Sequence, residues 1–374
     1  MKLRFAHHLR AIAALLVVFY HYWGIFFSAT VRSIVGVPTS FAPAQPEYTH
    51  HVMAPPLGDF FYGVFGVGLF FLISGLVIPI SLRNLTVSQF LVRRFFRIYP
   101  VYWLCLFVSA CLYVVSSRYW STPLSERISA PFLWRNLPLL HSASGMPSLD
   151  FVCWSLGVEI KFYIVFALIS LFGRHAHRVM TCMVIFSTLC CLVAWIASRQ
   201  PAQDSMVIQL ASDMRFMTFM FLGCLFYYVL YGELSVKAAL GFGLIIYAQF
   251  LGINMSYGDG FPGVLASNYT YALLVFTACY LGRARFKRNR LLDFLADISF
   301  PLYLIHSVIG YVVMPILMDN GLVYTPAWMV SLGMAILAAY GIHRVVEIPA
   351  NALGKRLGSR RTETRVVACR DPAG

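Results

Sequence analysis

Ten apolar stretches, each of roughly 18–22 residues with few or no charges, constrain the fold of this 374-residue chain more than any other feature. A helix of about 20 apolar residues is long enough to cross a hydrocarbon layer about 30 Å thick. The stretches are solidly apolar, whereas strands of a membrane β-barrel alternate apolar and polar residues over roughly ten positions. The sequence therefore predicts an all-α polytopic membrane protein with about ten transmembrane helices.

The composition and the placement of charge agree with this class. Apolar residues make up 59% of the chain and charged residues 12%, whereas soluble domains are roughly 45–50% apolar and about 25% charged. The net charge of +14 comes from short basic clusters between the apolar stretches, a placement typical of cytoplasmic loops rather than of nucleic-acid binding. We therefore expect no nucleic-acid partner. The nine cysteines include no Cys-x-x-Cys pair, so we expect neither a disulfide framework nor a metal site.

The basic clusters also predict the orientation of the chain. With the N-terminus inside, 22 of the 29 lysines and arginines fall on the inner side, and the positive-inside rule then makes both termini cytoplasmic. We expect residues 1–350 to form a transmembrane domain and residues 351–374 a basic cytoplasmic tail. The longest outer segments, about 31–59 and 118–151, are too short for an independent core. The predicted spans are 9–28, 60–82, 98–117, 152–172, 179–197, 213–231, 236–254, 267–282, 298–318 and 327–346.

Polar side chains at bilayer depth are candidates for function, because a charged group there costs several kcal/mol. Two lie in the first span, Arg10 near its inner end and His21 near its middle. Eleven residues make about three helical turns, so the two side chains share one face and lie about 16 Å apart along the helix. An interhelical hydrogen bond from His21 with a snorkelling Arg10 is one interpretation, and a catalytic stripe is the other.

The motif RRFFRIYP places Arg93, Arg94, Arg97 and Tyr99 at the inner mouth of the third span. Arg94 and Arg97, three residues apart, point the same way on a helix. Paired guanidinium groups bind phosphate in a bidentate manner. Anchoring to anionic lipid headgroups is the alternative interpretation of the same cluster.

The motif WSLGVEIKFY places Trp154, Ser155 and Glu159 at the outer part of the fourth span. A buried carboxylate needs a partner, and Lys161 diverges from Glu159 because the two are only two residues apart on a helix. We therefore expect Glu159 to pair with Arg215, at the outer end of the sixth span, or with an imidazole. Structural pairing and catalysis both fit the sequence.

Further polar candidates lie in the second and ninth spans. FPLYLIHS carries Tyr303 and His306 on one helical face. His306 fits either a polar side chain that lines a site or a packing residue. GVFGVGLFFLISG contributes Ser74, together with glycines such as Gly68 and Gly75 that allow helices to approach closely.

Taken in order, these motifs resemble those of the acyltransferase 3 family of integral membrane acyltransferases. LRAIAALLVVFYH is similar to the family's first-helix pattern, in which an arginine is followed by ten residues and a histidine. Later matches are GVFGVGLFFLISGLVI, RRFFRIYPVYWL, WSLGVEIKFY, RFMTFMFLGCLF, ISFPLYLIHS and HRVVEIPA. The likeness covers roughly residues 4–350. There are two departures: His7 and His8 stand where relatives often have Asp-Gly, and Gly68 stands where they often have aspartate.

The resemblance implies transfer of an acyl group, usually acetyl, from cytoplasmic acyl-CoA to a sugar hydroxyl. The implied acceptor is a surface polysaccharide, a lipopolysaccharide or another glycoconjugate, and the implied location is the lipid bilayer of a bacterial inner membrane. Acetyl-CoA is then a donor substrate, with no bound cofactor and no metal. The implied catalytic residues are His21, Arg10 and Glu159, and the implied donor-binding residues are Arg93, Arg94, Arg97 and Tyr99. The site-lining residues are Ser74, Trp154, Ser155, Tyr303, His306 and Arg215.

The implied chemistry suits a histidine. A sugar hydroxyl is a poor nucleophile at neutral pH and needs a positioned base, a role that imidazole can fill near that pH. His21 can instead act as a nucleophile and form an acyl-histidine, and the sequence leaves both routes open. A transporter or polysaccharide flippase, with polar residues lining a pathway, is the competing class. An acyltransferase would consume acyl-CoA in a reaction that requires His21, whereas a transporter or flippase would not.

Overall fold

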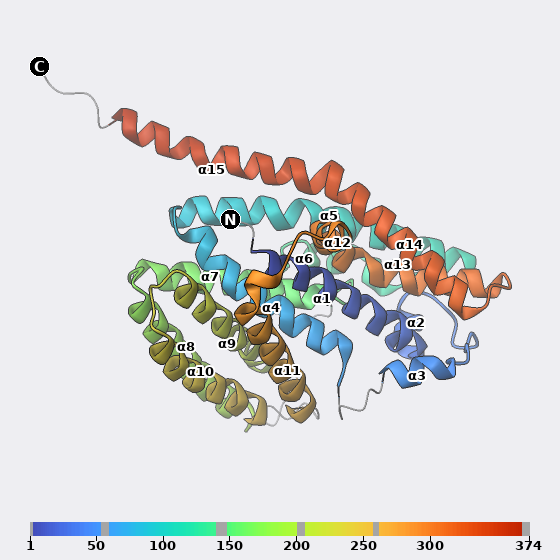
Figure 1. Ribbon diagram of the computed structural model, residues 1–374. Coiled ribbons are helices and arrows are strands. Elements are labelled where there is room, and N and C mark those ends of the chain that lie inside the picture. The colour runs from blue at the N-terminus through green and yellow to red at the C-terminus, as the bar shows by residue number, and fades with distance from the viewer. Residues whose placement is uncertain (1–2, 54–59, 140–147, 200–205, 257–261, 369–374) are drawn as a thin grey trace, which may run out of the picture.

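The computed structural model describes residues 3–53, 60–139, 148–199, 206–256 and 262–368 (Figure 1). These residues form helices and turns, with no strand among them. Ten helical segments in the described part of the chain are long and apolar enough to cross a membrane, which confirms the predicted fold class and number of spans. The segments are Arg4–Phe27, Tyr62–Leu82, Val87–Tyr119, Cys153–Leu171, Ala176–Ala197, Ser212–Leu230, Val236–Ser256, Gly263–Leu281, Ser299–Asp319 and Tyr324–Ser359.

The described residues contain fifteen α-helices. In chain order they are α1 (Arg4–Trp23), α2 (Ala29–Ile34), α3 (Glu47–Met53), α4 (Tyr62–Leu82), α5 (Val87–Tyr119), α6 (Ala130–Asn136), α7 (Cys153–Leu171), α8 (Ala176–Ala197), α9 (Met206–Leu230), α10 (Val236–Ser256), α11 (Pro262–Leu281), α12 (Arg290–Asp297), α13 (Ser299–Asp319), α14 (Tyr324–Ile342) and α15 (Ile348–Ala368).

Four helices, α1, α4, α9 and α13, form the interior of the bundle. Helices α4, α9 and α13 are buried over most of their length, whereas α8, α10 and α11 expose large apolar side chains such as Leu189, Leu244 and Leu274. Exposed leucines on long apolar helices are the expected surface towards lipid. Polar side chains held between the interior helices are therefore shielded from the bilayer.

Helices α4 and α9 cross at two glycines. A Cβ atom added at Gly75 would lie 2.1 Å from the carbonyl oxygen of Met220 and 2.9 Å from the Cα atom of Gly223. No side chain fits in that space, so only glycine at these positions allows the backbones of α4 and α9 to approach this closely. The predicted role of Gly75 in close packing is confirmed.

The segment between α5 and α7 does not stay at the outer face, where the sequence analysis placed it. Tyr99 lies 20 residues before Tyr119, the last residue of α5, or about 30 Å along the helix. The Tyr99 hydroxyl nevertheless donates a hydrogen bond to the carbonyl of Pro138 at 3.0 Å. Residues 130–139 therefore run back along α5 to membrane depth.

Aromatic side chains of α5 satisfy the backbone of this re-entrant segment. Carbonyl groups away from water need an internal partner. The Tyr102 hydroxyl donates to the carbonyl of Asn136 at 2.7 Å, and the indole of Trp103 donates to the next carbonyl at 3.0 Å. The Tyr113 hydroxyl donates to the carbonyl of Leu149 at 2.7 Å. Aromatic side chains of α5 thus hold the end of α6 and the chain that follows it in place.

One turn of π-helix, His343–Glu347, joins α14 to α15. Such turns are rare and occur often at functional sites. Here Glu347 is 3% exposed, and its Oε1 lies 3.4 Å from Nη1 of Arg97. Beyond it α15 lies alongside α5 (Figure 1). The predicted tail, 351–374, therefore begins within a helix that packs on the membrane domain, and residues 369–374 lie outside the described residues.

The predicted orientation leads to a direct test of topology. We expect a reporter fused after Arg365, or inserted near Gly173 between α7 and α8, to give a cytoplasmic signal. A reporter inserted near Pro46 should give an external signal. Paired reporters active on opposite sides of the membrane measure this. An external signal from the fusion after Arg365 would refute the inner location of both termini.

Candidate active site

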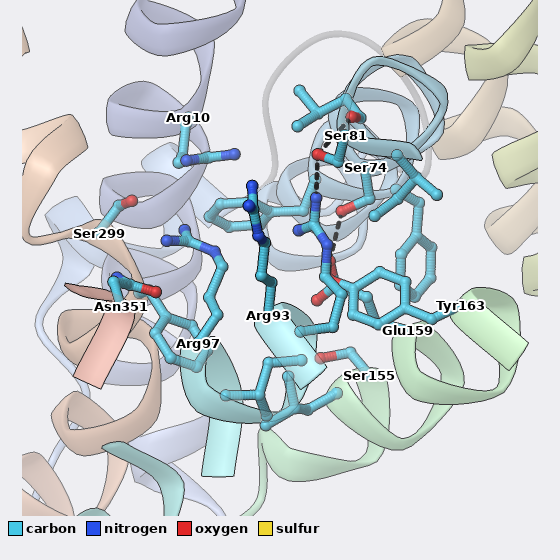
Figure 2. A pocket seen from close by; sticks show the side chains of 18 of the residues that line it. Arg10, Ser74, Ser81, Arg93, Arg97, Ser155, Glu159, Tyr163, Ser299 and Asn351 are labelled. Atoms are coloured by element: carbon cyan, nitrogen blue, oxygen red, sulfur yellow. Dashed lines mark hydrogen bonds between the residues drawn. The ribbon is translucent and has the colours of Figure 1, made fainter. Parts of the chain in front are cut away.

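A cavity of about 510 Å³ opens between α1, α4, α5, α7, α13 and α15. Figure 2 shows Arg10 of α1 and Arg93 and Arg97 of α5 directed towards the same space. The basic lining residues are Arg10, Arg93, Arg94, Arg97 and Lys355, and the one acidic residue among those that line it is Glu159. The cavity, which we name the basic cavity, suits a ligand that carries several negative charges.

The positive charge of the basic cavity is only partly balanced by the protein. Arg94 donates to the Ser81 hydroxyl and lies over the ring of Tyr163, both neutral partners, whereas Arg97 faces Glu347. The Nε atom of Arg93 is buried and has no hydrogen-bond partner within the described residues. Arg10, Arg93 and Arg94 have no carboxylate partner among the described residues, so positive charge remains here for an anionic ligand.

Glu159 lies inside the basic cavity, not at the outer part of its span. Its Oε1 accepts hydrogen bonds from the Ser74 hydroxyl at 2.8 Å and from the Tyr163 hydroxyl at 2.5 Å (Figure 2). Lys161 pairs instead with Asp213 on α9. The expected outer position was wrong because the re-entrant segment starts α7 at depth, which brings its second turn level with the arginines.

A second, smaller cavity of about 120 Å³ contains His21. We name it the histidine cavity; its other polar or aromatic lining residues are Tyr20, Trp154, Tyr269 and Tyr303. Val67 and Tyr303 line both cavities. The two cavities are therefore neighbours, with these two side chains between them, and we call this place the junction. Arg10 lies on one side of it and His21 on the other, both on α1.

His21 forms a pair with His306 of α13. Nδ1 of His21 lies 2.8 Å from Nε2 of His306, and the two rings stack with centroids 5.0 Å apart. His306 is fully buried, and its Nδ1 lies 3.0 Å from the carbonyl oxygen of Leu302. The two histidines are separated by 285 residues in the chain.

The Leu302 carbonyl decides how this pair shares its protons. A carbonyl oxygen only accepts, so Nδ1 of His306 carries hydrogen. In a neutral ring Nε2 of His306 is then the acceptor, and Nδ1 of His21 is the donor to it. The remaining nitrogen of His21, Nε2, therefore has a free lone pair in the histidine cavity. Such a nitrogen can take a proton or attack a carbonyl carbon.

The hydroxyl groups at the junction are already engaged. Tyr303 and Ser155 lie 2.7 Å apart through their hydroxyls, and both are within reach of the carbonyl of Val152, at 3.3 Å and 3.0 Å. One hydroxyl proton is therefore donated to the Val152 carbonyl, and the other lies between the two hydroxyl oxygens. This network fixes Tyr303 where the two cavities meet.

A buried carboxyl, which the sequence analysis did not single out, lies behind the histidine pair. Asp150, at 3% exposure, accepts a hydrogen bond from the hydroxyl of Ser307, the residue after His306. Burial raises the pKa of Asp150 to about 6. Asp150 thereby anchors the start of α7 to α13 next to the catalytic candidate.

The structure brings most of the predicted site residues together. Arg10, Arg93, Arg94, Arg97, Ser74, Ser155, Glu159 and Tyr303 line the basic cavity, and His21, Trp154 and Tyr303 line the histidine cavity. Three predicted residues are not among those that line these two cavities. The Tyr99 hydroxyl bonds the re-entrant segment, and Arg215 lies over the ring of Phe216. His306, expected to line the site, is instead fully buried behind His21.

Fold and site together define a membrane-embedded helical protein with a basic cavity next to a second cavity that contains a histidine. The sequence model of a family described as an acyltransferase domain matches residues 3–344. The chain therefore belongs to the acyltransferase 3 family, and this membership favours acyl transfer over the transport alternative. No curated protein and no solved structure matches the chain.

The two departures from the family pattern have local explanations. Nε2 of His7 and Nε2 of His8 lie 3.7 Å and 3.4 Å from Oδ1 of Asp293, so α12 supplies a carboxylate where relatives often carry one on α1. At Gly68 an added Cβ would lie 3.0 Å from the Cβ of Ala272. Helix α11 therefore occupies the space that an aspartate side chain would need.

Proposed function

We propose that this acyltransferase moves an acetyl group from acyl-CoA to a sugar hydroxyl of a surface polysaccharide, lipopolysaccharide or other glycoconjugate. The observation that supports it best is the junction of the two cavities at Val67 and Tyr303. One cavity offers phosphates several guanidinium groups without a carboxylate partner, and the other offers a histidine nitrogen with a free lone pair. A thioester at the junction has its carbonyl carbon within the reach of both spaces.

In the proposed reaction, Nε2 of His21 accepts the proton of the sugar hydroxyl as its oxygen attacks the thioester carbonyl carbon. The C–S bond then breaks, and the same proton passes from Nε2 to the departing CoA thiolate. The ester product keeps the acyl group, and His21 returns to its starting tautomer. His306 holds that tautomer through its bond to Nδ1 of His21.

The assay uses membranes from cells that express the chain, incubated with acetyl-CoA labelled in its acetyl group. We expect label to enter the polysaccharide fraction as an ester that alkali removes, with none in membranes that lack the chain. Label that stays on CoA would refute the proposal. A burst of free CoA equal to the enzyme, without any acceptor, would show the acyl-histidine route instead of direct transfer.

Arg94 and Arg97 give a prediction about donor binding. Replacing either with alanine should raise KM for acetyl-CoA about 10- to 150-fold, because a hydrogen bond to a charged group contributes roughly 1.5–3 kcal/mol. Saturating donor should restore most of kcat, since the contact is made equally in ground and transition states. Lysine should rescue only in part, because it lacks the planar fork. Initial rates over a titration of acetyl-CoA measure this.

Arg118, exposed on the same helix α5 and not a lining residue of the basic cavity, is the matched control. We expect Arg118→Ala to leave KM unchanged. If Arg94 and Arg97 serve only to anchor the chain to anionic lipid, their variants will be less abundant but keep the wild-type KM. That outcome would remove both arginines from the donor site.

A further inference from the structure

Helix α15 forms one wall of the basic cavity. Asn351 and Lys355, one helical turn apart, both line it. Both residues lie beyond residue 344, where the match to the family ends. This wall is therefore a feature of the present chain that the family match does not describe.

Two glycines set α15 tightly against α5. A Cβ atom added at Gly354 would lie 2.7 Å from the Cβ of Phe96, and one added at Gly358 would lie 3.1 Å from Nε of Arg93. Arg93 also lies within 3.5 Å of the hydroxyl of Ser359. These contacts fix the rotation of α15, which keeps Lys355 at the cavity.

Lys355 marks the mouth of the basic cavity. It is the only exposed residue among those that line the cavity, whereas Arg10, Arg93, Arg94 and Arg97 are all partly shielded. Its ammonium group has no hydrogen-bond or ion-pair partner in the described part of the chain. Lys355 is thus the cation of the basic cavity that is most open to solvent, and the four arginines are more shielded.

An acyl-CoA molecule is long, and its groups follow one another in a fixed order. Its thioester is at one end, the pyrophosphate lies beyond the pantetheine arm, and the 3′-phosphate of the ribose is at the far end. If the thioester lies at the junction near Val67 and Tyr303, the group that reaches the mouth is the 3′-phosphate. Resting on the proposed function, we infer that Lys355 binds this 3′-phosphate and selects CoA thioesters over donors that end at the pyrophosphate or at phosphopantetheine.

The test combines a change in the protein with a change in the donor. KM is measured for acetyl-CoA and for acetyl-3′-dephospho-CoA, in membranes that carry the wild-type chain, Lys355→Ala or Arg356→Ala. Arg356 is the matched control, because it is an exposed cation on the same helix and does not line the cavity. Protein amount in each membrane is measured in parallel.

We expect Lys355→Ala to raise KM for acetyl-CoA about 5-fold, the size of an ion pair near solvent. KM for the dephosphorylated donor should not change, because the partner phosphate is absent, and Arg356→Ala should match wild type with both donors. An equal rise for both donors, or no rise for acetyl-CoA, would overturn the inference while wild-type activity still supports the proposed function. No transfer by the wild type from either donor would overturn both.

Discussion

Replacing His21 with alanine should lower acyl transfer about 10²- to 10⁴-fold, the usual contribution of a positioned acid–base group. His21 lines the histidine cavity, and its hydrogen bond to His306 keeps the lone pair of its Nε2 atom free. The loss should appear in kcat, because no donor contact is removed. Initial rates of labelled acetyl transfer at saturating acetyl-CoA, normalised to protein amount, measure this change in kcat.

His177, exposed on α8 and remote from both cavities, provides the control. His177→Ala should keep wild-type activity and abundance, which excludes a general effect of removing a histidine from the bundle. A His21→Ala variant that retains more than about a third of the activity at equal abundance would end the assignment of His21 as base or acyl carrier.

His306→Phe should lower kcat about 10- to 10³-fold, with KM for acetyl-CoA unchanged. Phenylalanine keeps a ring in the buried site but removes the acceptor for Nδ1 of His21, so the wrong tautomer of His21 becomes available. A wrong tautomer alone costs about 10⁴-fold in a serine protease, which sets an upper limit. Steady-state kinetics with both variants of the pair, alone and together, measure the coupling.

His306→Gln separates positioning from packing. Its side-chain carbonyl can accept from His21, so it should recover part of the activity that phenylalanine loses. Because His306 acts through His21, adding His306→Phe to His21→Ala should cause little further loss. Equal losses with phenylalanine and glutamine, or a rise in KM for the donor, would refute the positioning role.

The sequence was a good guide to the spans and to local clusters. Apolar length fixes helices that cross a bilayer, whatever their neighbours, and Arg94 and Arg97 share a cavity because three residues on one helix bring side chains together. The contact of His21 with His306 was beyond such reasoning, since helical periodicity says nothing about which helices become neighbours. The pair rests on the packing of α1 against α13.

Tyr99 on α5 and Lys355 on α15 show a second reason why the sequence predicted the site incompletely. Tyr99 belongs to a basic motif and was expected to bind donor, yet its hydroxyl bonds the re-entrant segment. A segment that re-enters the membrane without crossing it has no apolar stretch long enough to be recognised in the sequence. The sequence did not indicate Lys355 as a lining residue of the cavity for a similar reason. A short basic helix cannot be told from a solvated tail until the helix against which it packs is known.

The hydrogen bonds from aromatic side chains to the re-entrant segment predict two kinds of loss-of-function mutation. Removing the hydroxyl of Tyr102 or Tyr113 leaves a carbonyl unpaired at membrane depth, which costs several kcal/mol there and leaves both cavities in place. Alleles at these tyrosines should therefore behave as temperature-sensitive losses of protein amount, whereas alleles at His21 or Arg94 should make abundant but slow enzyme. A screen that records abundance and turnover together would sort unselected mutants into these two groups without a structure.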